Sequence, residues 1–182
     1  MPISSLDKTT ALVVIDLQKG ILSMPRVHSI ADVLANSARL AQAFRARGLP
    51  VALVNVAGVA PGRTQAKMNF TPPPDWTDLA PELGSAPDDI LVTKHTWGAF
   101  HGTALDMMLR RRGVTQVALA GVATSIGVES TARAAYEHGY HVALVTDAMT
   151  DMSLEAHQNS LERIFPRLGE MGATAEMLAL LS

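Results

Sequence analysis

Two isolated charges and one turn of small residues are the features of this chain that could carry chemistry. Asp16 stands near the end of the apolar run TALVVIDL, and Lys94 comes directly after a shorter apolar run, ILVT. The stretch GVATSIGVEST, residues 121–131, leads into a pattern with helical spacing. A carboxylate and an ammonium can exchange protons with a substrate, and N–H groups in a narrow turn at a helix start favour an anion or a polarised oxygen. The set predicts an acid–base pair beside an oxyanion-type cradle.

Each of these features also has a structural interpretation. Asp16 could cap a nearby turn, and the small residues at 121–131 could serve only to let a helix pack closely on a sheet. A lone charge inside a sheet is costly unless it is paired, whereas a charge at the carboxyl end of a strand can face a crevice. The choice between the two interpretations therefore depends on where the strands end.

Continuous apolar runs predict strands that are buried on both faces, as in parallel sheets. Such strands are expected at 10–17, 50–57, 90–93, 114–120 and 141–146. Helices are expected at 29–47, 103–113, from the 121–131 turn to about 138, and at 154–168, with Ser29, Thr103 and Ser153 as caps. Residues 172–181 could form a sixth strand or a short helix. The alternation predicts an α/β fold in which the strand ends at Asp16, Lys94 and the small-residue turn share one edge.

Composition excludes several classes of function. The 182 residues are 48% hydrophobic and carry a net charge of -2, which predicts a single globular domain over 1–182 and no nucleic-acid partner. The absence of cysteine excludes disulfides, thiolate metal sites and a catalytic thiol. No apolar run approaches the ~20 residues that span a bilayer. The polar start MPISSLDKTT does not resemble a signal peptide, so a cytoplasmic protein without membrane contact is expected.

One proline-rich segment, residues 58–89, interrupts the regular alternation. A loop of this length inside a domain is usually functional or disordered, so we expect a lid or an oligomer contact. Arg63 and Lys67 within it are candidate anion contacts, or else solvated surface charges. His95 and His101 flank an aromatic pair, but their spacing does not match a metal site, and no metal is expected.

The motifs together resemble the isochorismatase-like hydrolase superfamily. The similarity rests on VVIDLQKG with Asp16 and Gln18, TKHTWGAFHGT with Lys94, GVATSIGVESTARAAYEHGY, and VTDAMTD, in this order. The resemblance implies a three-layer α/β/α, Rossmann-like fold with a six-stranded, mostly parallel sheet. It also implies a homo-oligomer (a dimer or tetramer), a small-molecule substrate without a cofactor, and a cis peptide bond between Val122 and Ala123.

The chain departs from most of the superfamily at the nucleophile. Most members resemble nicotinamidase in using a Cys–Asp–Lys triad, and the cysteine position aligns with Gly127. The zinc cluster of nicotinamidases is also missing, because NVAG stands at Asn55–Gly58. Isochorismatases share the aspartate, the lysine and the glycine. The resemblance therefore implies cleavage of a vinyl ether, from isochorismate to 2,3-dihydro-2,3-dihydroxybenzoate and pyruvate, or of a related small carboxylated substrate.

This function gives each candidate residue an expected role. Asp16 is the expected general acid, Lys94 is expected to orient it or to bind a substrate carboxylate, and Gly127 leaves room for the enolpyruvyl group. Further candidate substrate contacts are Gln18, Arg63, Trp97, Val122, Ala123, Ser125 and Ile126. Isochorismatases carry an aromatic residue and a histidine where Ala123 and Ser125 stand here, which is why the substrate can differ.

Two other functions stay open. The chain could be a binding protein that kept the crevice and lost the nucleophile. It could instead be an amidase-type hydrolase using Ser125 or Thr124, which ranks last because neither falls on the cysteine position and no histidine base is placed beside them by sequence.

Overall fold

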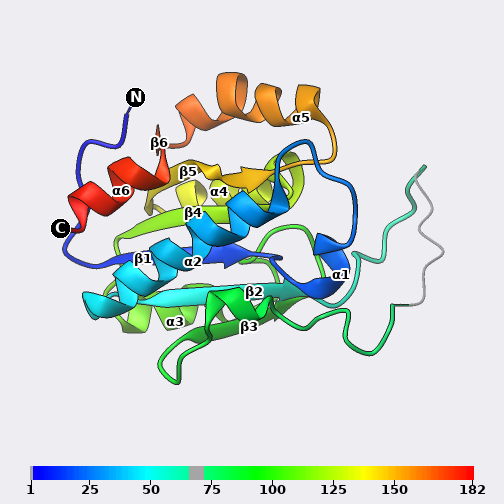
Figure 1. Ribbon diagram of the computed structural model, residues 1–182, viewed down its shortest axis with the longest axis horizontal. Helices are drawn as coiled ribbons and strands as arrows, with labels where there is room; N and C mark the ends of the chain where they lie inside the picture. Colours follow the sequence, from blue (N-terminus) through cyan, green and yellow to red (C-terminus); the bar gives the residue numbers. More distant parts are fainter. Residues whose placement is uncertain (1, 66–71) are drawn as a thin grey trace.

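A single sheet of six strands forms the centre of the computed structural model, which describes residues 2–65 and 72–182 (Figure 1). The strand order is β3-β2-β1-β4-β5-β6, and all five neighbouring pairs are parallel. The strands are β1 (Thr10–Ile15), β2 (Val51–Val56), β3 (Ile90–Lys94), β4 (Gln116–Val122), β5 (His141–Thr150) and β6 (Glu170–Gly172). The predicted six-stranded α/β sheet is thus confirmed, and it is parallel throughout.

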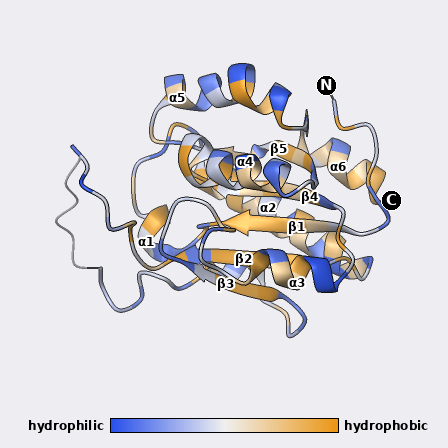
Figure 2. Cartoon of the chain, turned by 180° about the vertical axis from the view of Figure 1, so that it is seen from behind, coloured by the Kyte–Doolittle hydropathy of each residue, from blue (hydrophilic) through white to orange (hydrophobic). Residues whose placement is uncertain are grey.

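Helices cover both faces of the sheet, as the two opposite views show (Figures 1 and 2). The longest helix, α2 (Ile30–Ala46), and α6 (Thr174–Leu180) pack on one face. The helices α3 (Leu105–Arg111) and α4 (Glu129–Glu137) pack on the other. The short helices α1 (Lys19–Leu22) and α5 (Leu154–Asn159) come after β1 and β5. None of the described helices combines the length and the apolar character needed to cross a membrane.

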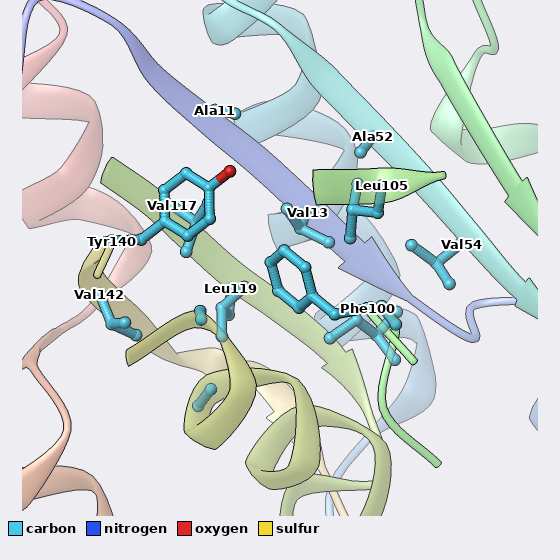
Figure 3. Packing of buried hydrophobic residues seen from close by; sticks show 14 of the residues in the cluster. Ala11, Val13, Ala52, Val54, Phe100, Leu105, Val117, Leu119, Tyr140 and Val142 are labelled. Atoms are coloured by element: carbon cyan, nitrogen blue, oxygen red, sulfur yellow. The ribbon is translucent and has the colours of Figure 1, made fainter. Parts of the chain in front are cut away.

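The burial of each strand results from its place in the sheet. All six residues of the central strand β1 are buried, because helices cover it on both sides and strands flank it on both edges. The edge strand β3 instead alternates between buried and exposed positions. Figure 3 shows how Val13 of β1 and Leu119 of β4 meet Phe100 and Leu105 in the core between the sheet and the α3–α4 layer.

Side chains define two of the helix starts as predicted. The Ser29 hydroxyl accepts a hydrogen bond from the N–H of Asp32, and the Ser153 hydroxyl accepts one from the N–H of Ala156. The expected cap Thr103 lies one residue too early, because α3 starts at Leu105 and Ala104 is its N-cap residue. The Thr103 hydroxyl still accepts from the N–H of Leu105, at 3.2 Å.

Two predicted boundaries were wrong for local physical reasons. The strand expected to end at 146 runs to Thr150, because a register shift between β4 and β5 lets pairing resume after the irregularity. The helix expected over 154–168 ends its α-helical part at Asn159 and continues as a π turn and a 3-10 turn, where Pro166 supplies no N–H. Of the two alternatives left open for residues 172–181, the segment forms the short helix, α6, while the sixth strand, β6, lies just before it and ends at Gly172.

Gly121 allows the closest approach between β4 and β1. It pairs with Ile15 and has a φ of +118°, a conformation that residues with a Cβ rarely adopt. A Cβ at this position would lie 2.0 Å from the carbonyl oxygen of Ile15. This contact brings the turn after β4 directly beside Asp16, so the glycine is a condition for the geometry of the site.

Replacing Gly121 with alanine is therefore expected to destabilise the protein by about 3 kcal/mol or more, because both the φ angle and the backbone contact are violated. Gly48→Ala is the matched control. Gly48 also has a positive φ, +66°, but a Cβ there would meet nothing within 4 Å, so the expected cost is only about 1–2 kcal/mol. Urea unfolding of the two variants measures the difference. Equal losses would show that the approach to β1 is not tight.

Candidate active site

The two isolated charges meet at the carboxyl edge of the sheet. Asp16 comes directly after β1, and Lys94 is the last residue of β3. Because β2 lies between these strands, the long Lys94 side chain has to reach across the end of β2. Its Nζ donates to Oδ2 of Asp16 at 2.7 Å, and the two side chains are only 1% and 8% exposed. The arrangement is a buried ion pair at the edge where ligands bind in parallel sheets.

The two carboxylate oxygens of Asp16 have different environments. Oδ2 accepts the hydrogen bond from Lys94, whereas Oδ1 is buried and has no hydrogen-bond partner among the described residues. Burial raises the pKa of the Asp16 carboxyl to about 6, although the Lys94 ammonium acts to lower it. A carboxyl with one free oxygen and this pKa can hold and release a proton near neutral pH.

The backbone turns sharply at Asp16. Its φ is +53°, in the left-handed region that Asp and Asn tolerate better than most residues. Its N–H still donates to the carbonyl of Val54 at 2.9 Å, which keeps it attached to the end of the sheet. The turn aims the carboxyl across the strand ends and toward Lys94.

Lys94 has a second fixed contact. Its Nζ also donates to the carbonyl of Thr96, at 3.1 Å. An ammonium carries three N–H donors, so these two bonds leave one donor for a further acceptor. The loop after β3 therefore helps to aim the ammonium, and Trp97 lies in that loop with 64% of its surface exposed.

The small-residue turn lies beside this pair. The peptide bond between Val122 and Ala123 is cis, and the chain continues as a π turn, Thr124–Val128, before α4 begins. A Cβ at Gly127 would lie 3.4 Å from Oδ2 of Asp16. The same Cβ would lie 3.1 Å from Cγ2 of Ile15 and 3.2 Å from the carbonyl oxygen of Val122, so Gly127 packs closely against β1 and the turn. The absence of a side chain at Gly127 is what allows its backbone to lie this close to the Asp16 carboxyl.

Several N–H groups of this turn already have partners inside the protein. The N–H and the hydroxyl of Ser125 both donate to Oδ2 of Asp151, at 2.7 and 2.8 Å. The N–H of Ile126 donates to the carbonyl of Ala123 at 3.0 Å. The N–H groups of Ser125 and Ile126 thus hold the turn itself together, and substrate contact by these two residues stays a prediction. Val122 is fully buried, while Ala123 is partly exposed.

The remaining candidate substrate contacts, Gln18, Arg63 and Lys67, differ in burial and location. Gln18 is fully buried, and its amide bonds only to main-chain groups, the N–H and carbonyl of Val56 and the carbonyl of Trp76. The Gln18 amide thus links β2 to the segment at residue 76, and its role as a substrate contact stays a prediction. Arg63 is exposed in the segment after β2, and Lys67 lies outside the described residues.

The sequence analysis did not identify four candidate functional residues near the turn after β4. They are Asp151, His157, His28 and Arg26. Asp151 is 2% exposed and accepts both hydrogen bonds from Ser125. His157 places Nδ1 2.9 Å from the hydroxyl of Thr124, and its ring lies 4.6 Å from that of His28. Arg26 has a buried Nε without a partner among the described residues. The helical spacing after the Ser153 cap, which turns His157 inward, was the signal that could have found it.

The hydroxyl–imidazole pair corrects one argument about a Thr124 nucleophile. A histidine does stand beside Thr124, and burial together with His28 lowers the pKa of His157, so that it is neutral and able to accept a proton. However, Thr124 is completely buried. A substrate has no access to its hydroxyl in this conformation.

The described residues contain no group of three or more His, Cys, Asp or Glu side chains that could hold a metal ion. His95 and His101 are not part of such a group.

Comparison with known proteins agrees with this geometry. An isochorismatase domain matches residues 10–176. The uncharacterized isochorismatase family protein YwoC of Bacillus subtilis (strain 168) is 42% identical over 177 residues, which are 93% of this chain and 92% of that protein. Ureidoacrylate amidohydrolase RutB of Methylobacterium radiotolerans is 30% identical over an alignment that covers 90% of this chain and 76% of that protein. An isochorismatase family protein from Burkholderia thailandensis superimposes with a TM-score of 0.88 at 48% identity, covering 97% of both chains. The chain belongs to the isochorismatase family of hydrolases.

Proposed function

We propose that this protein hydrolyses a vinyl ether, with isochorismate or a related small carboxylated compound as substrate, by general-acid catalysis without a nucleophilic side chain. The observation that carries the proposal is the Asp16 carboxyl, which has one oxygen without a partner among the described residues, a pKa of about 6 and the side-chain-free Gly127 packed beside it. A thiol mechanism has no counterpart here, since the chain contains no cysteine.

The first step is transfer of a proton from Asp16 to carbon. The enolpyruvyl group of isochorismate is a vinyl ether, CH2=C(COO⁻)–O–R. Protonation of its CH2 carbon gives a methyl group and an oxocarbenium ion, and leaves Asp16 as a carboxylate. With a pKa of about 6, about a tenth of the Asp16 side chains carry the proton at pH 7. The reactive acid form is thus a minor but substantial species at neutral pH.

The second step uses the carboxylate that the first step creates. Water adds to the oxocarbenium carbon and gives up a proton to Asp16, forming a hemiketal. The hemiketal hydroxyl then loses its proton as the C–O bond to the alcohol breaks, and the departing alkoxide oxygen takes up a proton. Pyruvate and the free alcohol are released, and Asp16 keeps the proton that it gained from the water. Gly127, beside Oδ2, carries no side chain that would stand between the Asp16 carboxyl and the group that reacts.

Lys94 and the turn supply the electrostatic part of the site. The ammonium keeps the Asp16 carboxylate stable after the proton has left, because the two groups are 2.7 Å apart. The third N–H donor of Lys94 is available to the substrate carboxylate or to the attacking water. Of the main-chain donors in the turn, Ala123 and Gly127 are the candidates to hold a carboxylate, because Ser125 and Ile126 are committed within the protein.

The amidase alternative has weaker support in this chain. The relatives of the chain include an amidohydrolase, and an amide substrate needs a nucleophile that attacks its carbonyl carbon. Thr124 is buried, and the Ser125 hydroxyl donates to Asp151. The buried Asp16–Lys94 pair argues against a binding protein without catalysis. Buried ion pairs can often be replaced by apolar residues without loss of stability. A protein that did not use the two charges would therefore have no need to keep both of them.

Incubation of the purified protein with isochorismate is expected to release pyruvate, which a coupled lactate dehydrogenase assay measures. Asp16→Asn removes the proton that the first step needs and is expected to lower kcat by about 100- to 10,000-fold. Asp32→Asn, on the exposed first turn of α2, is the matched control and should retain full activity. A folded wild-type protein without turnover would contradict isochorismate as substrate, and an active Asp16→Asn variant would contradict the assigned acid.

The pH dependence of this reaction is set by the raised pKa of Asp16. The reaction consumes the protonated form, so kcat/KM is expected to fall about tenfold per pH unit above a midpoint near 6. Lys94 acts to lower that pKa, so Lys94→Met is expected to move the falling limb to higher pH. A pH–rate profile of both proteins tests this. A limb that stays in place, or that moves to lower pH, would show that another group supplies the proton.

A further inference from the structure

We propose that Thr131 is a positioning residue, whose hydroxyl fixes the turn at Gly127 relative to the loop that aims Lys94. Thr131 lies in the first part of α4 and is completely buried. Among the described residues, its hydroxyl forms hydrogen bonds with Gly127 and Ala99 and none with Asp16. The inference rests on the proposed function only for what the positioned groups do, and it can be tested without a substrate.

The Thr131 hydroxyl joins two segments that are distant in sequence. It donates to the carbonyl of Gly127 at 2.7 Å and accepts from the N–H of Ala99 at 3.0 Å. The first bond alone would be ordinary, because helical threonines commonly bond to the carbonyl four residues earlier. The second bond crosses 32 positions of sequence and ties α4 to the loop after β3.

That loop controls the second contact of Lys94. The Lys94 ammonium donates to the carbonyl of Thr96, and the Thr96 hydroxyl donates to the carbonyl of Gly98 at 3.2 Å. Gly98 in turn lies against the α4 backbone, where a Cβ would be 3.4 Å from the carbonyl oxygen of Ser130. The hydrogen bond from the N–H of Ala99 to the Thr131 hydroxyl therefore completes a continuous series of contacts that runs from Lys94 to Gly127.

The hydroxyl uses both of its hydrogen-bonding capacities, so its orientation is determined. The hydroxyl proton is donated to the carbonyl of Gly127, and an oxygen lone pair accepts the N–H of Ala99. Ala99 is completely buried. Valine has nearly the same shape but neither capacity, and would leave a buried N–H group unpaired. Serine keeps both capacities and loses only a methyl group.

A thiol introduced at Gly127 reports on this arrangement without any substrate. The chain has no cysteine, so Gly127→Cys creates a single thiol. Its Cβ would lie 3.4 Å from Oδ2 of Asp16 and 3.1 Å from Cγ2 of Ile15, so the neighbouring groups must shift by a few tenths of an ångström. The Lys94 ammonium stabilises a thiolate there and the Asp16 carboxylate opposes it, so the thiol pKa depends on how these groups are placed. The pH midpoint of alkylation by iodoacetamide measures the thiol pKa, and thermal unfolding confirms that each variant is folded.

Four changes are compared in the Gly127→Cys background. Thr131→Val and Thr131→Ala are each expected to raise the alkylation midpoint by about one pH unit, because the ammonium and the turn lose their fixed placement. Thr131→Ser is expected to keep the midpoint. Thr10→Val is the matched control, since Thr10 is equally buried and bonded to Asp7 and Gln116 at the far end of β1.

Three results would overturn the proposal. They are an unchanged midpoint in the hydroxyl-free variants, a shifted midpoint in Thr131→Ser, and an equal shift in Thr10→Val, which would indicate general loosening of the fold. If Thr131→Val does not fold, Thr131→Ala and Thr131→Ser still decide the matter. Because the measurement uses no isochorismate, it can succeed or fail independently of the pyruvate assay.

Discussion

The buried ion pair between Asp16 and Lys94 is the interaction on which the rest of the site depends. Removing two charges from water costs several kcal/mol for each ion unless they are paired closely and hydrogen-bonded. The pair is close, at 2.7 Å, yet Asp16 keeps one oxygen without a partner among the described residues. The pair is therefore incompletely compensated, and the raised pKa of the carboxyl expresses this imbalance. The same feature that weakens the pair as a stabilising contact makes Asp16 a usable acid.

The surrounding structure holds the turn after β4 against this pair from three sides. Asp151 bonds to Ser125, the imidazole of His157 bonds to Thr124, and the hydroxyl of Thr131 bonds to the carbonyl of Gly127. These contacts come from the end of β5, from α5 and from α4. A site that relies on electrostatics rather than on a covalent intermediate needs its groups in place before the substrate arrives. The distribution of these bonds is consistent with that need.

Sequence patterns predicted the strands, their parallel arrangement and the edge at which Asp16 and Lys94 meet, because continuous apolar runs and the charges that end them are local signals. They could not assign Gln18, whose polar type is equally suited to a substrate and to the main chain. Its actual partners on β2 and at residue 76 are set by tertiary packing. The helical spacing after Ser153 indicates that His157 turns inward, but not that it meets Thr124, because that contact depends on tertiary packing. Thr131 has no local signal at all, because its second bond reaches Ala99 across 32 positions.

Direct titration of the Asp16 carboxyl is the measurement closest to the central claim. The protein would be labelled with ¹³C at its aspartate carboxyl groups, and the Asp16 signal identified by its absence in Asp16→Asn. A midpoint near 6 is predicted, since burial outweighs the effect of Lys94. A midpoint near the ordinary aspartate value of 3.8 would mean that the ion pair is fully compensated. In that case Asp16 would carry almost no proton at neutral pH, and general-acid catalysis by this residue would be contradicted.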